Sequence, residues 1–396
     1  MRTSALVAMC LSVVMSAGLS GRIAAGAEET PAKQLDLTYV TADCYAAVIF
    51  HPQQMAKLPA AAPLVKRLEK AEMPAVFNPL HIEQVVVMFP GHAAGDRHAN
   101  SPAPVFVLRF GKGVNVDAMA ADLLRDQGAR QLSEARVLGK KCYKFAAPAE
   151  EADNGGRPKR REVPPTMTCA ADDRTVLLSH EGEDRLQKML SASAVKSPLV
   201  EQLRNVDVGH DVVVVYVVEP VLEQVKQEIE RDRKHAHPPM IPLMDTLPLL
   251  RHFTVSLDLN DDTLGKIVLQ PADAASVAKI ESLARLFQQK AKEEIQRERT
   301  FFAEHFTAKL PEPIERLFSL GEKLLDAMTV TKTDGGVALS LKPTKGIGPE
   351  VLKTFFDFCT RRGGAEKKPS ESGPSKDSAK ANRLPTTEDK KASPER

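Results

Sequence analysis

The run from Val212 to Val218, Val-Val-Val-Val-Tyr-Val-Val, constrains the fold more than any other stretch of this 396-residue chain. All of its residues favour β-structure, and Asp211 precedes it while Glu219 and Pro220 follow it. The run is too short for a transmembrane helix, which needs about 20 apolar residues. A short, continuous and β-branched run is typical of a central strand that is covered on both faces. We therefore predict a buried strand here.

A second segment, Cys44 to Pro52, reads Cys-Tyr-Ala-Ala-Val-Ile-Phe-His-Pro and is a weaker copy of the first. Both segments end in an acid or histidine followed by proline, and both lead into a helical pattern. This pairing predicts an α+β fold of two tandem, duplicated halves, residues 28–205 and 206–360. Each half would be a mainly antiparallel sheet packed against amphipathic helices, in the order strand, helix, hairpin, helix, hairpin, helix.

Periodicity and turn residues place the other elements. The expected strands cover residues 45–50, 82–89, 105–110, 136–145, 167–170, 175–179, 211–218, 251–259, 264–270, 329–333 and 337–341. The expected helices cover residues 55–70, 115–126, 183–190, 198–204, 221–233, 274–300, 314–328 and 349–359. We predict a loop for the proline-rich connection from His237 to Pro248. Asp334-Gly335-Gly336 is a strong hairpin-turn signal.

The two ends of the chain differ in composition from its centre. Residues 1–27 combine Arg2, an uncharged and mostly apolar run, and a small-residue site at Ala25-Gly26-Ala27, which is the pattern of a signal peptide. A retained membrane anchor is the alternative. No later stretch is apolar enough to span a bilayer, so we expect an exported, periplasmic or extracellular protein without a transmembrane segment in its mature chain. Residues 361–396 have almost no large apolar side chains, and we expect a disordered polar tail.

The composition argues against several classes of function. The chain has 54 Lys and Arg against 52 Asp and Glu, so no overall positive charge would attract nucleic acid. It has no Trp and four Tyr, which leaves few platforms for stacking bases or sugars. The ten histidines show no metal-ligand spacing, and no glycine-rich phosphate motif is complete. We therefore expect no nucleic-acid partner, no metal and no cofactor.

Removal of the leader with Cys10 leaves four cysteines, Cys44, Cys142, Cys169 and Cys359. In an exported protein four cysteines permit two disulfides in three connectivities. Cys142 and Cys169 lie in flanking strand-like segments, so we favour that pair, which leaves Cys44 with Cys359. Four free, buried thiols are the alternative.

No catalytic motif is assembled along the sequence, since a Gly-x-Ser-x-Gly elbow and a His-Glu-x-x-His helix are both absent. A site could still form in space, because catalytic triads are defined by geometry and not by order. The candidates are His51 and His210, at the ends of the two central strands, and Glu219 beside the second of them. This is the hydrolase hypothesis.

The leader, the Tyr39–Pro52 segment with its strand-His-Pro ending, Ile82–Pro90, Val105–Gly113 and Asp211–Pro220 together resemble a family of uncharacterised exported proteins of planctomycete-type bacteria. The resemblance covers residues 37–360. It implies compartment and fold, and the family has no assigned activity. Our leading hypothesis is a non-enzymatic exported protein, associated with the cell envelope, that binds a protein partner or an apolar ligand between its sheets and helices.

Overall fold

The computed structural model describes residues 35–58, 62, 65–66, 81–91, 103–112, 114–126, 132–145, 165–192, 196–258, 265–305 and 312–341. All of them belong to one compact unit, Met1–Asp357. The predicted signal peptide, the polar tail, Cys359 and the predicted helix over 349–359 lie outside the described residues.

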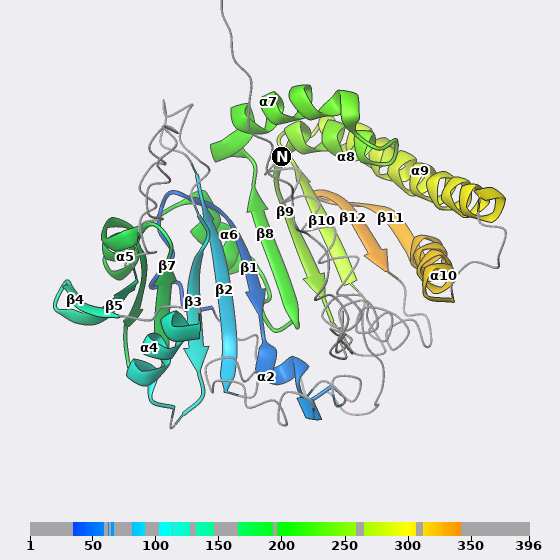
Figure 1. Ribbon diagram of the computed structural model, residues 1–396. Coiled ribbons are helices and arrows are strands. Elements are labelled where there is room, and N and C mark those ends of the chain that lie inside the picture. The colour runs from blue at the N-terminus through cyan, green and yellow to red at the C-terminus, as the bar shows by residue number, and fades with distance from the viewer. Residues whose placement is uncertain are drawn as a thin grey trace, which may run out of the picture. The chain divides into compact units, whose positions relative to one another are not determined.

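The described strands form a single sheet of twelve strands in which every neighbouring pair is antiparallel (Figure 1). Their order across the sheet is β11-β12-β10-β9-β8-β1-β2-β3-β7-β6-β5-β4. The bounds are β1 Cys44–Phe50, β2 Ile82–Pro90, β3 Val105–Phe110, β4 Ser133–Val137, β5 Lys140–Phe145, β6 Thr166–Ala170, β7 Thr175–Ser179, β8 Val212–Val217, β9 Leu250–Leu257, β10 Gly265–Pro271, β11 Met328–Thr333 and β12 Gly336–Leu341.

Helices connect these strands. The α-helices are α2 Pro52–Met55, α4 Val116–Asp126, α5 Gly182–Leu190, α6 Pro198–Asn205, α7 Leu222–Asp232, α8 Met240–Thr246, α9 Ser276–His305 and α10 Glu312–Ala327. Three short 3₁₀ turns are η3 Glu219–Val221, η4 Arg233–His235 and η5 Leu247–Leu249. The mixed helices and antiparallel sheet confirm the α+β class.

The two segments singled out by sequence, β1 and β8, are neighbours at the centre of the sheet. They pair antiparallel with Phe50 opposite Val212 and Ala46 opposite Tyr216. Every residue of β8 is buried. The prediction of a central strand covered on both faces is therefore confirmed, and the strands of both predicted halves belong to one sheet.

Alternate residues of the central strands feed separate cores, because side chains along a strand point to opposite faces. On one face, Ala47 and Ile49 join a cluster with Leu186 of α5 and Leu203 of α6. On the other face, Ala46 and Val48 join a cluster with Ile280 and Ala284 of α9 and Val225 of α7. Also on that second face, α4 covers the outer strands of the first half through Met119 and Ala120. The sheet is therefore packed by helices on both sides at its centre.

At strand β9 the sheet is covered on one face only. Phe253, Val255 and Leu257 are buried toward α9, whereas His252 and Thr254, which alternate with them, are partly exposed. Such alternation is typical of an antiparallel strand with one solvated face.

Two helices on this side of the sheet, α8 and α9, differ from what the sequence predicts. The region His237–Pro248 is not a loop, because the structure contains α8 and η5 there. The prediction was wrong since Pro242 sits inside the first turn of α8, where its missing N–H and its fixed φ are tolerated. The predicted long helix is confirmed as α9, which is five residues longer at its C-terminal end than expected and packs on α8 and α10.

Candidate functional site

Antiparallel pairing of β1 with β8 brings two of the sequence candidates together. His51 directly follows the last residue of β1, and His210 is separated from the first residue of β8 by Asp211 alone. Both histidines therefore lie at the same end of the antiparallel pair. The backbone N–H of His51 donates to the carbonyl of Asp211 over 3.2 Å. The third candidate, Glu219, lies in η3 at the opposite end of β8 and is exposed. The structure therefore separates Glu219 from the two histidines.

The imidazole of His51 is buried, with 3% of the residue exposed. Its Nδ1 lies 2.9 Å from the carbonyl oxygen of His210, which can only accept, so Nδ1 carries the proton and donates. Its Nε2 then accepts from Nε2 of Gln84 over 3.1 Å. Both ring nitrogens are engaged, and His51 acts as a tie between β1, β2 and the start of β8.

The imidazole of His210 faces carboxylates. Its Nδ1 lies 2.9 Å from Oδ2 of Asp258, which follows β9, and its Nε2 lies 3.9 Å from Oδ2 of Asp207. The hydrogen bond with Asp258 raises the pKa of His210 against the opposing effect of burial. The imidazole of His210 therefore stays protonated to a higher pH than a free histidine does.

The contacts of the two imidazoles are those of a structural tie. The ring nitrogens of His51 and His210 lie against a carbonyl, an amide and two carboxylates. A general base needs a nucleophile's proton within hydrogen-bonding reach. The arrangement is that of a hydrogen-bonded tie between strand ends from both halves of the sequence.

We expect His210→Gln to lower the free energy of unfolding by about 1 kcal/mol at about pH 5.5 and by less than about half of that at about pH 9. A raised folded-state pKa stabilises the protein fully below the ordinary histidine pKa, and this stabilisation is lost as pH rises through the raised value. Urea unfolding of both proteins at each pH measures the difference. His235→Gln, a change at an exposed histidine of η4, is the control, and equal losses at both pH values for His210→Gln would contradict the interpretation.

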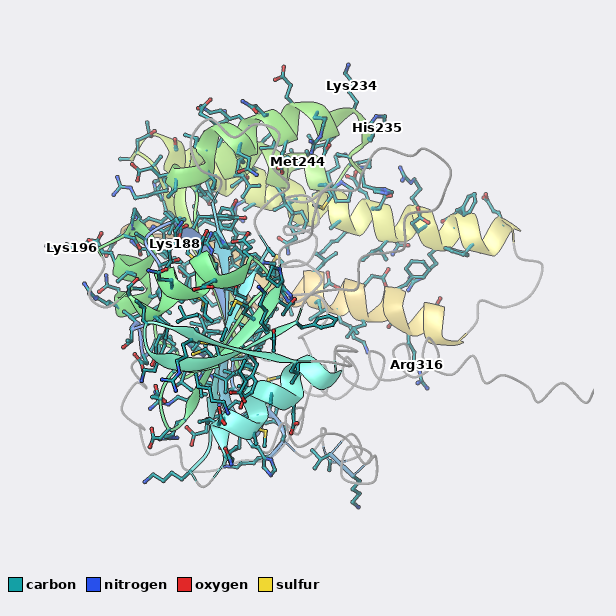
Figure 2. All side chains as sticks on the ribbon, turned by 60° about the vertical axis from the view of Figure 1, so that its left-hand side comes forward. Lys188, Lys196, Lys234, His235, Met244 and Arg316 are labelled. Atoms are coloured by element: carbon teal, nitrogen blue, oxygen red, sulfur yellow. The ribbon has the colours of Figure 1, made fainter. Side chains whose placement is uncertain are left out.

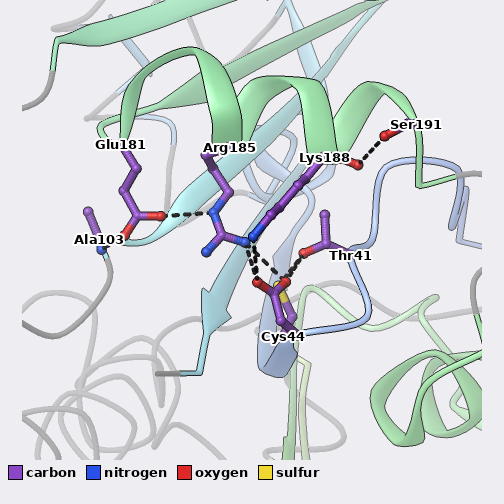
Figure 3. Close-up of polar contacts among 8 residues, drawn as sticks. Thr41, Cys44, Ala103, Glu181, Arg185, Lys188 and Ser191 are labelled. Carbon is purple, nitrogen blue, oxygen red and sulfur yellow. Dashed lines mark hydrogen bonds and ion pairs between the residues drawn. The ribbon is translucent and has the colours of Figure 1, made fainter. Parts of the chain in front are cut away.

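A second polar cluster lies at the other end of β1 (Figure 3). Arg185 of α5 is buried, and its Nη1 donates to both carboxylate oxygens of Asp43 over 3.0 and 2.8 Å. Its Nε donates to Glu181 over 2.8 Å, and the other oxygen of Glu181 accepts from the backbone N–H of Ala103 over 2.7 Å. Asp43 also accepts from the hydroxyl of Thr41 over 2.6 Å. One arginine thus ties α5 to the segments that enter β1 and β3.

The charges of this cluster depend on one another. Burial alone would raise the pKa of Asp43, but the hydrogen bonds from Thr41 and Arg185 outweigh it and hold that pKa below the ordinary value. Arg185 was not predicted as a site residue. The sequence feature that points to it is its four-residue spacing from Glu181, which allows an ion pair at the start of α5.

The described cysteines, Cys44, Cys142 and Cys169, are buried and are not bonded to one another in this structure, and the disulfide between Cys142 and Cys169 stays a prediction. Cys142 of β5 lies directly opposite Cys169 of β6. Burial raises the pKa of Cys44 to about 11, and its Sγ lies 3.1 Å from the hydroxyl of Thr41. The pairing of Cys44 with Cys359 falls outside the described residues and stays a prediction.

Two helices of the second half, α8 and α9, carry apolar side chains that are not fully buried (Met244 of α8 is labelled in Figure 2). On α8, Met240, Ile241, Leu243 and Met244 are all only partly buried, and α8 packs against α9. On α9, Leu286 is 40% and Phe301 is 49% exposed. We call these six residues the α8–α9 surface. This surface was not predicted from the sequence, because four of its six residues lie in a segment that was predicted to be a loop.

The described residues contain no group of three or more His, Cys, Asp or Glu side chains placed to hold a metal ion. Over the same residues, no helix has the length and apolarity needed to cross a bilayer.

Comparisons with known proteins give no family. No protein-family model matches the chain, and no curated protein matches it. Among solved structures it is similar to TP0453 in crystal form I, with 9% sequence identity and a TM-score of 0.36, over 82% of this chain and 98% of that chain. This TM-score is too low to support an argument about fold or function.

Proposed function

We propose that this chain is a non-enzymatic exported binding protein and that the α8–α9 surface receives a protein partner. The observation that carries the proposal is the exposure of two large apolar side chains on α9, the helix against which α8 packs with its own partly exposed apolar residues. Leu286 and Phe301 on α9 are two of the three large apolar side chains that are exposed among the described residues. Exposed apolar groups that cluster on one surface are typical of interaction sites.

The chemistry of this surface favours a protein over an apolar small molecule. Methionine and aromatic residues are enriched at the centres of protein interfaces, and charged residues form their rims. Met240, Met244 and Phe301 fit the first group. Between Leu286 and Phe301, α9 carries Lys290 and Glu293, which form an ion pair at its exposed side. Small-molecule sites are concave and bury most of the ligand, whereas these side chains lie on the outside of helices.

The strand order supports the proposal that the two halves are duplicated. From the centre outward, the first half runs β1, β2, β3, β7, β6 and the second runs β8, β9, β10, β12, β11. The positions along the chain correspond pair by pair, and the first half adds the hairpin β4–β5 at its edge. The second half differs in carrying α8, the long α9 and α10. The first part of α9 covers the sheet through Ile280 and Ala284, whereas Leu286 and Phe301 further along the helix are exposed, and this is where we place the binding function.

Site-specific photo-cross-linking in the native host tests the partner. We expect a benzoylphenylalanine at position 286 to give a discrete cross-linked product with another protein. Leu138 is 56% exposed at the β4–β5 turn, so the same probe there is the matched control and gives no such product. Adding Met244→Glu to the position-286 protein lowers the yield at least about fivefold, as expected for an interface residue worth about 1 kcal/mol.

Three outcomes would contradict the proposal of a protein partner. The first is a cross-linked product of equal yield at positions 138 and 286, and the second is a product with twice the mass of the chain. The third is a lipid adduct in native mass spectrometry of the purified protein. The second would indicate self-association, and the third would favour an apolar ligand.

A hydrolase is the second candidate, motivated by the convergence of His51 and His210. It requires a nucleophilic hydroxyl or thiol within hydrogen-bonding reach of one of these histidines. Covalent labelling by an active-site-directed fluorophosphonate, lost in His210→Gln, would favour the hydrolase over the binding protein.

A further inference from the structure

Two cysteines face each other across the β5–β6 pair. Cys142 and Cys169 are directly opposite each other on neighbouring antiparallel strands. Directly opposite residues have Cβ atoms about 4.5–5.5 Å apart and a disulfide needs about 3.5–4.5 Å, so a small local approach of the two strands brings them to bonding distance. Both residues are 0% exposed and both belong to the core cluster that α5 covers with Leu186 and Met189. Their side chains therefore point to the same side of the sheet.

We propose that Cys142 and Cys169 form a disulfide in the functional protein and that Cys44 remains a thiol. The bond would join β5 to β6 and close the connection between them, residues 146–165. Cys44 stands apart from this pair, at the start of β1, where its Sγ contacts the hydroxyl of Thr41. The inference goes beyond the proposed binding function and does not depend on it.

Oxidation needs an acceptor, and glutathione disulfide serves in solution. The thiolate of Cys142 attacks one sulfur of glutathione disulfide and releases one glutathione. The thiolate of Cys169 then attacks the mixed disulfide and releases the second, so two protein thiols lose two electrons and two protons to two glutathione molecules. The hydrogen bond between the thiols lowers the pKa of Cys142 and raises that of Cys169, which makes Cys142 the first nucleophile.

Burial of the pair predicts how the bond behaves. A reductant must reach one of the two sulfur atoms, and the core around them excludes it while β5, β6 and α5 stay packed. We therefore expect dithiothreitol to leave the bond intact in the folded protein and to cleave it rapidly in urea.

Peptide mapping provides a direct test. The full chain is refolded with a glutathione redox buffer, alkylated in urea without reduction so that buried thiols react, and digested with trypsin. The sequence predicts a cross-linked species between residues 142–144 and residues 162–174, because Lys141, Lys144, Arg161 and Arg174 bound these peptides. The peptide that contains Cys44 is expected to be alkylated. Alkylation of both Cys142 and Cys169, or a cross-link of either to another cysteine, would overturn the proposal.

Thermal unfolding supplies an independent measurement. Reduction of the unfolded wild-type chain before refolding should lower Tm by roughly 5 °C, because the bond restrains the unfolded chain. Cys44→Ala keeps this redox-dependent difference, and the double variant Cys142→Ala, Cys169→Ala loses it. A difference that persists in the double variant would also overturn the proposal.

Discussion

Replacing Arg185 with methionine is expected to lower the free energy of unfolding by about 3 kcal/mol at neutral pH. Methionine keeps the apolar stem and removes only the guanidinium, so the loss reports the charge contacts and not a cavity. Asp43 and Glu181 would keep their carboxylates at the end of the sheet without the cation that compensates them. The side chain of Arg185 is 8% exposed and that of Asp43 is 38% exposed. Partial solvation of Asp43 places the effect at the lower end of the range for broken buried ion pairs.

The pH dependence of this loss follows from the depressed pKa of Asp43. A carboxylate whose folded-state pKa lies below its ordinary value stabilises the protein above that ordinary value, and the stabilisation is lost as pH falls. The gap between the wild type and Arg185→Met should therefore shrink from neutral pH toward about pH 3. Urea unfolding at several pH values measures it. Lys226→Met, which removes an exposed ion pair with Glu223 on α7, is the control and should cost less than about 0.5 kcal/mol.

An effect of Arg185→Met no larger than that of Lys226→Met would contradict the role of Arg185 as a tie between α5 and the entries to β1 and β3.

Two adjacent glycines in the β11–β12 turn are expected to respond very differently to alanine. A Cβ at Gly336 would lie 2.2 Å from the carbonyl oxygen of Leu269, and both residues lie in strands of the sheet. Neither strand can move without weakening its ladder, so Gly336→Ala should lower the free energy of unfolding by about 3 kcal/mol.

Gly335→Ala is the matched comparison. The nearest atom to a Cβ at Gly335 is Oε1 of Gln270, at 3.4 Å, and that side chain can rotate away. The residue is exposed, and we expect a change within about 0.5 kcal/mol. Equal effects of the two substitutions in thermal or urea unfolding would show that the close approach of β10 to Gly336 is not what requires glycine there.

These glycines illustrate the reach of sequence reasoning. Asp334-Gly335-Gly336 predicted a hairpin turn, and the pairing of β11 with β12 confirms it. The requirement at Gly336 nevertheless comes from β10, a strand more than sixty residues earlier in the chain. Local turn chemistry is readable from neighbouring residues, whereas a backbone contact across the sheet is not.

The candidate site was predictable to a similar extent. The positions of His51 and His210 at strand ends followed from the strand predictions, but their meeting depended on the antiparallel pairing of β1 with β8. Arg185 was missed because an i,i+4 spacing with Glu181 is common on exposed helices. Its importance comes from Asp43, which lies far away in sequence and near in space.

By itself, the sequence determined most of the strands and helices, though not α8, as well as the burial of β8 and the α+β class, because periodicity and β-branching act locally. Only the tertiary structure decided that β1 and β8 pair at the centre of one twelve-stranded sheet. It also decided which polar side chains meet and which apolar ones stay exposed on α8 and α9. The physical reason is that strand pairing and side-chain packing bring together residues that are far apart in the chain. A local sequence pattern does not indicate which distant residue will bury a given side chain.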